Sequence, residues 1–229
     1  MQETAKHLPD GYSIRLMLDR DYPEIATICT MVYPTERPYT AGELTAHHRV
    51  FPEGQFVVQH DPTGAVAGVH FTLRLQLIHF YIDDSWDTLT AGGSFTDHEP
   101  DGHTLYTADL FVHPDHQHHG LGRELTNATR GLVREERLWR MVGGSRLPGY
   151  HRFLGRLAPD EYVARVKGGE IIDPVLTVHL HDGWDVVTAV RGYLPNDDES
   201  AGWAAVIQWV NPDCPPPPEF DVLRLPRGG

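Results

Sequence analysis

An apolar run that stops at a proline, crosses a glycine-containing turn and enters an amphipathic helix constrains the fold most. The run covers residues 104–113 and ends at Pro114, and Gly120 and Gly122 stand where the helix begins. Apolar residues then recur at helical spacing, at Leu121, Leu125, Ala128, Leu132 and Trp139. The first turn of a helix offers backbone N–H groups without intrahelical acceptors, and glycines let an anion approach them. We therefore expect a phosphate-binding turn at residues 117–123.

Two familiar phosphate motifs do not match this turn. A dinucleotide-binding G-x-G-x-x-G requires a third glycine, and Leu125 stands in its place. A P-loop requires Gly-Lys-Ser or Gly-Lys-Thr, which does not follow. Histidines that resemble a metal cluster lie in the turn, but no cysteine or second group of ligands stands at a recognised spacing; they are His113, His116, His118 and His119. We expect no metal site.

The pattern Gln117-x-x-Gly120-x-Gly122, after a strand that ends Val112-x-Pro114, resembles motif A of the GNAT superfamily of acetyl-CoA-dependent N-acyltransferases. Residues 105–109 before the motif, and residues 143–151 and 193–209 after it, resemble the acetyltransferase half of proteins in which a GNAT domain is fused to a nitrilase-type amidohydrolase. The resemblance implies that acetyl-CoA is bound largely by backbone groups. The implied cofactor-binding residues are Leu110, Phe111, Val112, Gln117, His118, His119, Gly120, Leu121, Gly122 and Arg123.

The resemblance also implies an α/β (α+β) fold of the GNAT type. Its central sheet is mixed and mostly antiparallel, with helices on both faces and a V-shaped splay between the two central strands. The elements predicted from the residues agree with this architecture. Predicted strands cover 13–18, 55–59, 65–76, 104–113, 140–143, 175–180, 184–194 and 203–210. Predicted helices lie between Asp19 or Asp21 and Pro34, between Thr40 and Pro52, from Gly120 to about Arg137, and from Pro159 to Lys167.

Strands 55–59 and 65–76 around the turn at 61–64 predict a hairpin, and alternation along 65–76 gives it a half-buried face. Residues 79–103 lack any period and contain many turn formers, so we expect a long functional loop beside the substrate, with Trp86 and His98 as substrate-binding residues. We expect one GNAT domain over 1–212 and a Pro-rich tail over 213–229.

Acyl transfer to an amine requires a group that takes a proton from the ammonium, and an acid can protonate the departing thiolate. Asp109, on the motif strand, is the candidate base, and Asp97 with His98 is the alternative. The position where the family often has a glutamate falls near Tyr106. Tyr150, after the next strand, is the candidate acid. Each has a structural alternative, because Asp109 can satisfy a buried N–H and Tyr150 can be a packed aromatic.

A formal net charge of -13 argues against nucleic-acid binding and favours a neutral or cationic partner. With no apolar N-terminal segment and no run of about 18 apolar residues, we expect no membrane segment and a cytoplasmic protein. Only two cysteines, Cys29 and Cys214, are present, which fits reduced thiols.

The expected function is transfer of an acetyl group from acetyl-CoA to a primary amine of a small molecule or peptide. The alternative is a noncatalytic CoA-binding or partner-binding module associated with an amidohydrolase. Partners left open are a second copy of the chain and an amidohydrolase.

Overall fold

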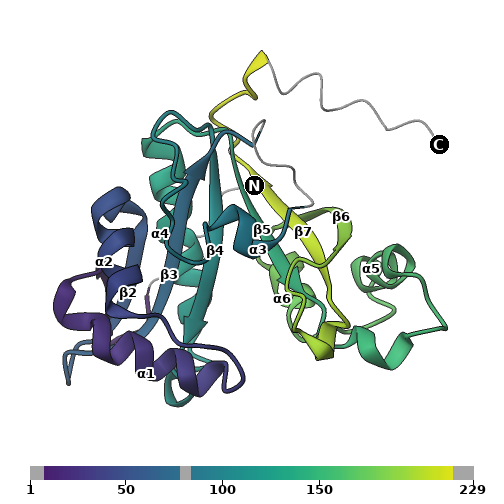
Figure 1. Ribbon diagram of the computed structural model, residues 1–229, viewed down its shortest axis with the longest axis horizontal. Helices are drawn as coiled ribbons and strands as arrows, with labels where there is room; N and C mark the ends of the chain where they lie inside the picture. Colours follow the sequence, from purple (N-terminus) through teal and green to yellow (C-terminus); the bar gives the residue numbers. More distant parts are fainter. Residues whose placement is uncertain (1–7, 78–83, 219–229) are drawn as a thin grey trace. The chain divides into compact units, whose positions relative to one another are not determined.

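The computed structural model describes residues 8–77 and 84–218. Among these residues seven strands form one sheet, in the order β1-β2-β3-β4-β5-β7-β6 (Figure 1). The strands are β1 (Tyr12–Leu16), β2 (Gln55–His60), β3 (Ala65–Leu75), β4 (Thr104–Val112), β5 (Arg140–Arg146), β6 (Asp185–Arg191) and β7 (Trp203–Val210). The helices are α1 (Tyr22–Val32), α2 (Ala41–Val50), α3 (Trp86–Leu89), α4 (Leu121–Glu135), α5 (Pro159–Lys167) and α6 (Leu176–His181).

The chain forms two compact units that interleave in sequence. The first takes in the described part of Met1–Leu73 together with Gly93–His98 and Thr107–Leu132. The second takes in the described parts of Arg74–Gly92, Glu99–Tyr106 and Val133–Gly229.

In the first unit β1 pairs with β2 and β2 pairs with β3, both antiparallel. Phe71 of β3 contacts the rings of Tyr39 and His47, so α2 and the connection before it cover one face of β3. On the other face, the Nδ1 of His70 lies 2.8 Å from the hydroxyl of Thr129 in α4. Helices therefore cover both faces of β3, which is buried along most of its length, and the prediction of a half-buried face was wrong because α4 supplies His70 with a polar partner.

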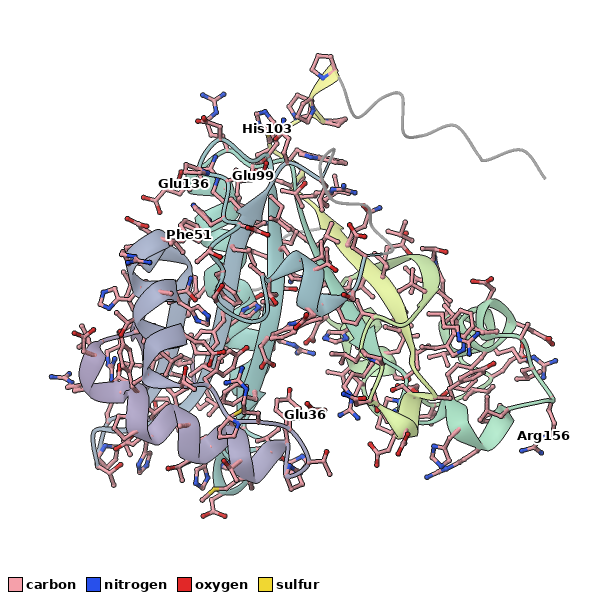
Figure 2. The ribbon with its side chains drawn as sticks, viewed as in Figure 1. Glu36, Phe51, Glu99, His103, Glu136 and Arg156 are labelled. Carbon is pink, nitrogen blue, oxygen red and sulfur yellow. The ribbon has the colours of Figure 1, made fainter. Side chains whose placement is uncertain are left out.

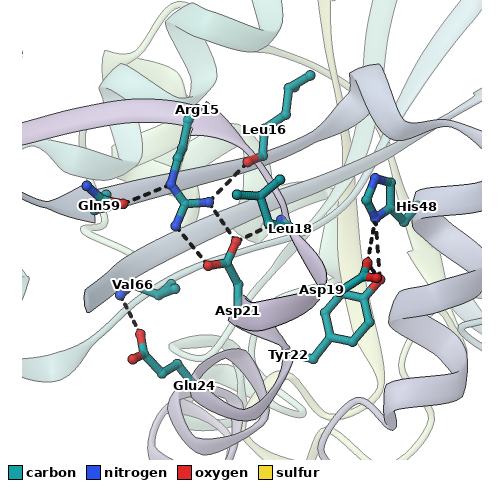
Figure 3. Close-up of polar contacts among 10 residues, drawn as sticks. All are labelled: Arg15, Leu16, Leu18, Asp19, Asp21, Tyr22, Glu24, His48, Gln59 and Val66. Carbon is teal, nitrogen blue, oxygen red and sulfur yellow. Dashed lines mark hydrogen bonds and ion pairs between the residues drawn. The ribbon is translucent and has the colours of Figure 1, made fainter. Parts of the chain in front are cut away.

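The start of α1 differs from the prediction in its capping. The sequence offers Asp19 or Asp21 as the cap, and Asp21 does stand at the N-cap position, but its side chain makes no capping hydrogen bond to the helix (Figure 3). The carboxylate of Asp21 accepts two hydrogen bonds from the guanidinium of Arg15, at 2.6 and 2.8 Å, and Asp19 accepts from the hydroxyl of Tyr22 at 2.9 Å. Asp19 also lies 3.0 Å from Nδ1 of His48 in α2, so the aspartates tie β1 and α2 to the start of α1. At α2 the sequence Thr40-Ala41-Gly42-Glu43 predicts a capping box, and the structure confirms it, with reciprocal bonds of 3.2 and 2.7 Å between Thr40 and Glu43.

In the second unit β7 pairs with both β5 and β6, antiparallel in each case. The N–H of Trp139 donates to the carbonyl of His103 at 3.2 Å, so β4 and β5 begin side by side. The predicted strand at 140–143 is longer than expected and runs to Arg146. The predicted helix Pro159–Lys167 and the predicted strand Trp203–Val210 are confirmed residue for residue.

The strand predicted at 175–180 was wrong, because this segment forms α6. One oxygen of the Asp173 carboxylate accepts from the N–H groups of Val175 and Leu176, both at 2.9 Å, which satisfies the free N–H groups at a helix start. Gly183, with φ of 81°, stands just beyond the helix end. Local capping therefore outweighs the strand preference of the β-branched residues.

The mixed, mostly antiparallel sheet with helices confirms the predicted fold class. The splay between the central strands and the domain limits stay predictions. Residues 79–83 of the predicted loop and 219–229 of the predicted tail lie outside the described residues. Within the described part of the chain, no helix has the length and apolar character that crossing a membrane requires.

Candidate functional site

The turn before α4 carries an unusual run of exposed backbone N–H groups. α4 begins at Leu121, which confirms a helix start at the glycines. The N–H groups of residues 118–122 have no hydrogen-bond acceptor among the described residues. His118 and Gly120 have φ of 65° and 78°, so the backbone turns through the left-handed region here. A Cβ built on Gly120 would meet no atom within 4 Å, and one on Gly122 would lie 3.4 Å from the side chain of Leu110.

Side chains of the same turn hold its shape. Gln117 donates from Nε2 to the carbonyl of Val112 at 3.2 Å, and the ring of His119 donates from Nδ1 to the carbonyl of Gln117 at 2.8 Å. Leu121 and Phe111 are buried in the core, both at 2% exposure, which leaves only their backbones available to a ligand. Helix-terminal N–H groups at the positive end of a helix dipole fit a diphosphate, so the donor set suits the nucleotide end of CoA.

Asp109 is held by two tyrosines that the sequence analysis did not single out. Its carboxylate accepts hydrogen bonds from the hydroxyl of Tyr33, at 3.1 Å, and from that of Tyr39, at 3.2 Å. Tyr33 follows α1 and Tyr39 precedes α2, so residues 33–39, which connect these helices, lie against β4 at Asp109. Packing against Phe111 and Phe71 fixes the two tyrosine rings.

Loss of water raises the pKa of Asp109 to about 6, although part of its surface is still accessible. The hydrogen bonds from Tyr33 and Tyr39 act in the opposite direction, and the negative charge of Glu36 adds to the rise. Glu36 is exposed on the same connection and is labelled in Figure 2. Burial, followed by the charge of Asp109, raises the pKa of the Cys29 thiol to about 11, so this thiol is protonated at neutral pH.

The residues predicted to line the acceptor side have mainly structural contacts. His98, in the first unit, stacks on Phe51 with ring centroids 4.7 Å apart. Trp86, in the second unit, begins α3, and its backbone N–H donates to the carbonyl of Tyr193 at 3.0 Å. Asp97, the alternative base with His98, is exposed.

Tyr150 is 3% exposed in the second unit, and its hydroxyl donates to the carbonyl of Leu157 at 3.0 Å. Burial raises the pKa of this phenol. Its ring packs against that of Tyr162, at 5.2 Å between centroids. Tyr150 is therefore packed as an aromatic residue of the core, and its role as the acid that protonates the thiolate stays a prediction.

The second unit also contains a buried tyrosine pair that joins β4 to the segment after β6. The hydroxyls of Tyr106 and Tyr193 share a hydrogen bond, and both residues are at most 4% exposed. The ring of Tyr193 lies directly over Gly144 of β5, where an added Cβ would come within 2.1 Å of it. Gly144 is therefore required for this packing. Tyr106, near which the family resemblance places a glutamate, makes a hydrogen bond between two neutral hydroxyls.

No group of His, Cys, Asp and Glu in the described residues could hold a metal ion.

Solved structures that are similar to this chain have the same type of fold. Structures similar to the chain include the GNAT-like decarboxylase GphF in complex with isobutyryl-CoA, with a TM-score of 0.75, 24% identity, and coverage of 87% of this chain and 99% of that one. The loading GNATL domain of CurA from Lyngbya majuscula has a TM-score of 0.74, 17% identity, and coverage of 87% and 98%. YncA of Salmonella typhimurium, solved with its cofactor acetyl-CoA, has a TM-score of 0.54, 16% identity, and coverage of 91% and 98%.

Similarity in sequence extends to two proteins of Bacillus subtilis (strain 168). The uncharacterized N-acetyltransferase YkwB is 32% identical over 179 residues, which are 78% of this chain and 78% of YkwB. The probable hydrolase YhcX is 30% identical over 203 residues, which are 89% of this chain, and the chain spans only 39% of YhcX. The model of the acetyltransferase (GNAT) family matches residues 13–144, more than half of the sequence. The chain therefore belongs to the acetyltransferase (GNAT) family.

Proposed function

We propose that this protein transfers an acetyl group from acetyl-CoA to a primary amine by direct attack. The observation that carries the proposal is the run of N–H groups at residues 118–122, which opens onto free space at Gly120. Family membership supports it, as do the acyl-CoA ligands of the YncA and GphF structures. The bound donor supplies the acyl group as an activated thioester.

In this proposal the turn before α4 binds the diphosphate of the donor through backbone N–H groups. Gly120 and Gly122 keep the approach free of side chains, and Arg123 adds a positive charge at the first turn of the helix. The backbones of Leu110 and Val112 contact the acyl and pantetheine part, as the family resemblance implies. Side chains in this region then vary without loss of binding.

Asp109 acts as the general base in this proposal. With a pKa of about 6, its carboxyl is mostly ionised at neutral pH and remains basic enough to accept a proton from an ammonium group. The hydroxyls of Tyr33 and Tyr39 orient the carboxylate. The net charge of -13 favours a cationic acceptor.

Tyr150 is the proposed acid that returns a proton to the thiolate, and it would have to exchange its bond to Leu157 for that role. Trp86 and His98 are proposed to contact the acceptor.

The deciding experiment incubates the protein with acyl-CoA donors and a panel of amines, and measures free thiol and acylated product. Acetylated amine formed together with free CoA supports the proposal. If calorimetry shows donor binding but no turnover is measured, the alternative of a noncatalytic CoA-binding module associated with an amidohydrolase is favoured. The similarity to YhcX, a longer probable hydrolase, points to this alternative. Malonyl-CoA belongs in the panel because GphF is a decarboxylase, and release of CO₂ in place of amine acylation would contradict the proposal. Absence of CoA binding would contradict both readings.

A further inference from the structure

Four imidazole rings and one phenol gather beside the turn before α4, all in the first unit. The group, called the histidine cluster here, consists of Tyr12, His60, His113, His116 and His119. The hydroxyl of Tyr12 lies 2.9 Å from Nδ1 of His116. Ring centroids are 5.3 Å apart for Tyr12 and His60, 5.0 Å for His60 and His116, and 5.4 Å for His113 and His116. His119 completes the group at 6.0 Å from Tyr12.

Each histidine of the cluster uses its Nδ1 atom for a hydrogen bond within the protein, which leaves its Nε2 atom available to a ligand. Nδ1 of His113 accepts from the N–H of Asp115 at 3.1 Å, so in the neutral ring Nε2 carries the proton. Nδ1 of His119 donates to the carbonyl of Gln117 at 2.8 Å, so Nε2 becomes a second donor when the ring is protonated. Among the described residues no partner engages Nε2 of His60, His113, His116 or His119.

Permanent positive charge is scarce around the turn. Residues 104–122 contain neither lysine nor arginine, and Arg123 is the first cation after β4. In β1, Arg15 is paired with Asp21. Protonated imidazoles are therefore the main source of positive charge that residues 104–122 can offer to an anion.

Two acidic groups on the elements that carry or adjoin the cluster are engaged in hydrogen bonds. Asp61, after β2, accepts from Ser13 at 2.6 Å, and Glu24 of α1 accepts from the N–H of Val66 at 2.6 Å (Figure 3). Asp115 raises the pKa of His116, but burial lowers it more, and His60, His113 and His119 lower it further. The imidazolium charges repel one another, and an anion placed among them would relieve this repulsion.

We propose that the histidine cluster is a proton-dependent subsite for a phosphate monoester, supplied by the 3′-phosphate of CoA. The inference rests on the proposed function, because His116 and His119 flank Gln117, where the turn proposed for the diphosphate begins. CoA carries a diphosphate and a phosphate monoester on the adjoining ribose, so one ligand presents both groups. A phosphate monoester takes its second charge near pH 6, the range in which histidine titrates.

Calorimetry with CoA and dephospho-CoA, at pH 6 and pH 8 and in buffers of different ionisation enthalpy, tests the subsite. We expect CoA binding to take up protons and to tighten about tenfold or more from pH 8 to pH 6, as one strengthened ion pair would give. Dephospho-CoA should show neither effect. His60→Gln and His116→Gln should remove the difference between the two ligands. His48→Gln is the matched control, because His48 is a half-buried histidine of the same unit, outside the cluster, that bonds to Asp19 (Figure 3).

Equal pH dependence for CoA and dephospho-CoA would overturn the subsite and leave the diphosphate turn intact. Failure of both ligands to bind would instead contradict the proposed function. At pH 6 inorganic phosphate should weaken the binding of CoA more than that of dephospho-CoA, because only CoA also occupies the cluster; binding of phosphate together with CoA would mean that the cluster takes a free phosphate and would overturn the CoA assignment. Circular dichroism checks folding, and His60→Gln, at the end of β2, carries the test if His116→Gln does not fold.

Discussion

Asp109 combines a structural and a chemical property in one side chain. Two phenol hydroxyls would by themselves lower its pKa, yet the loss of water outweighs them and brings the pKa to about 6. The same burial, with the charge of Asp109, raises the pKa of Tyr39 well above its usual value, so the tyrosine stays a neutral donor. A carboxylate that is still basic and is held by neutral donors suits a general base better than a purely structural ion pair.

We predict that Asp109→Asn lowers kcat/KM by about a hundredfold to ten thousandfold, the usual effect of losing a general base. The folded-state pKa of this acid is raised, so its contribution to stability falls as pH rises from about 4 to 6. The asparagine variant should therefore be no less stable than the wild type at pH 7. A thermal melt and steady-state kinetics measure both effects, and a large loss of stability with retained kcat/KM would assign Asp109 a structural role only.

The pH profile gives an independent prediction. Because the base must be ionised, kcat/KM of the wild type should rise about tenfold per pH unit below pH 6 and level off above it. Asp109→Asn should lose this limb of the profile. Asp97→Asn, which changes an exposed aspartate, should keep it. Loss of the limb in the Asp97 variant alone would move the base to Asp97.

For Tyr150 we predict that the phenylalanine variant lowers kcat with little change in acetyl-CoA affinity, because the pantetheine contacts are expected from backbone groups. Loss of the hydroxyl also removes the bond to Leu157, at a cost of about 1 kcal/mol in stability. Tyr162→Phe is the control, since it removes another tyrosine hydroxyl of the second unit, one bonded to Asp173 at 2.7 Å. If both variants keep wild-type kcat, Tyr150 is only a packing residue.

At the scale of elements, the start of α4 makes a sharp prediction for donor binding. Gly120→Asp places a side chain and a negative charge at the free N–H groups, so CoA affinity should fall below detection by calorimetry. Gly155→Asp is matched in conformation, because Gly155 has φ of 72° and open space around it, as Gly120 has with φ of 78°. The two variants share the backbone strain of an aspartate in the left-handed region. Equal CoA affinity in both would remove the turn from the donor site.

Elements with strong local signals could be predicted from the sequence. The helix α2 has a capping box, α5 has a proline at its start and glycines at its end, and both match the structure. For α6, the alternation of Val175 to Leu180 indicates a strand, while the signal for a helix is the pair Asp173-Pro174 just before it. The carboxylate of Asp173 decided the outcome, since it satisfies the first N–H groups of the helix.

The site was predictable to the extent that it is local. The turn before α4 and the start of that helix follow from neighbouring residues, so the helix start could be predicted, while phosphate binding by the turn stays a prediction. The partners of Asp109 come from Tyr33 and Tyr39, which lie 76 and 70 residues away in the chain. Only the packing of the α1–α2 connection on β4 brings them to the carboxylate, and no spacing within the motif indicates it.

At the scale of the whole molecule, the two interleaved units each contain a histidine that loses water on folding. Burial lowers the pKa of His47, in the first unit, to about 4, and that of His179, in the second, to about 4. Nδ1 of His179 lies 3.0 Å from the hydroxyl of Ser145. His47 donates from Nε2 to the carbonyl of Gly93 at 2.7 Å and stacks on Phe95 at 3.6 Å. We therefore expect a low pH to destabilise both units for the same reason, namely that burial disfavours the protonated form of each histidine.

We predict that the free energy of unfolding falls as pH drops from about 6.5 to 4. Above pH 6.5 these histidines are neutral in both states; below it the unfolded chain binds protons that the folded chain excludes until pH 4. For His47, which is fully buried, the loss is on the order of 3 kcal/mol. His47→Gln should flatten the dependence measured by urea unfolding between pH 7 and 4.5, although it also lowers stability at pH 7 through lost stacking. Phe95→Leu is the control, because it removes the stacked ring without a titrating group and should lower stability equally at every pH. An unchanged slope in His47→Gln would show that His47 has the same pKa in the folded protein as in the unfolded chain, and that burial does not hold its pKa down.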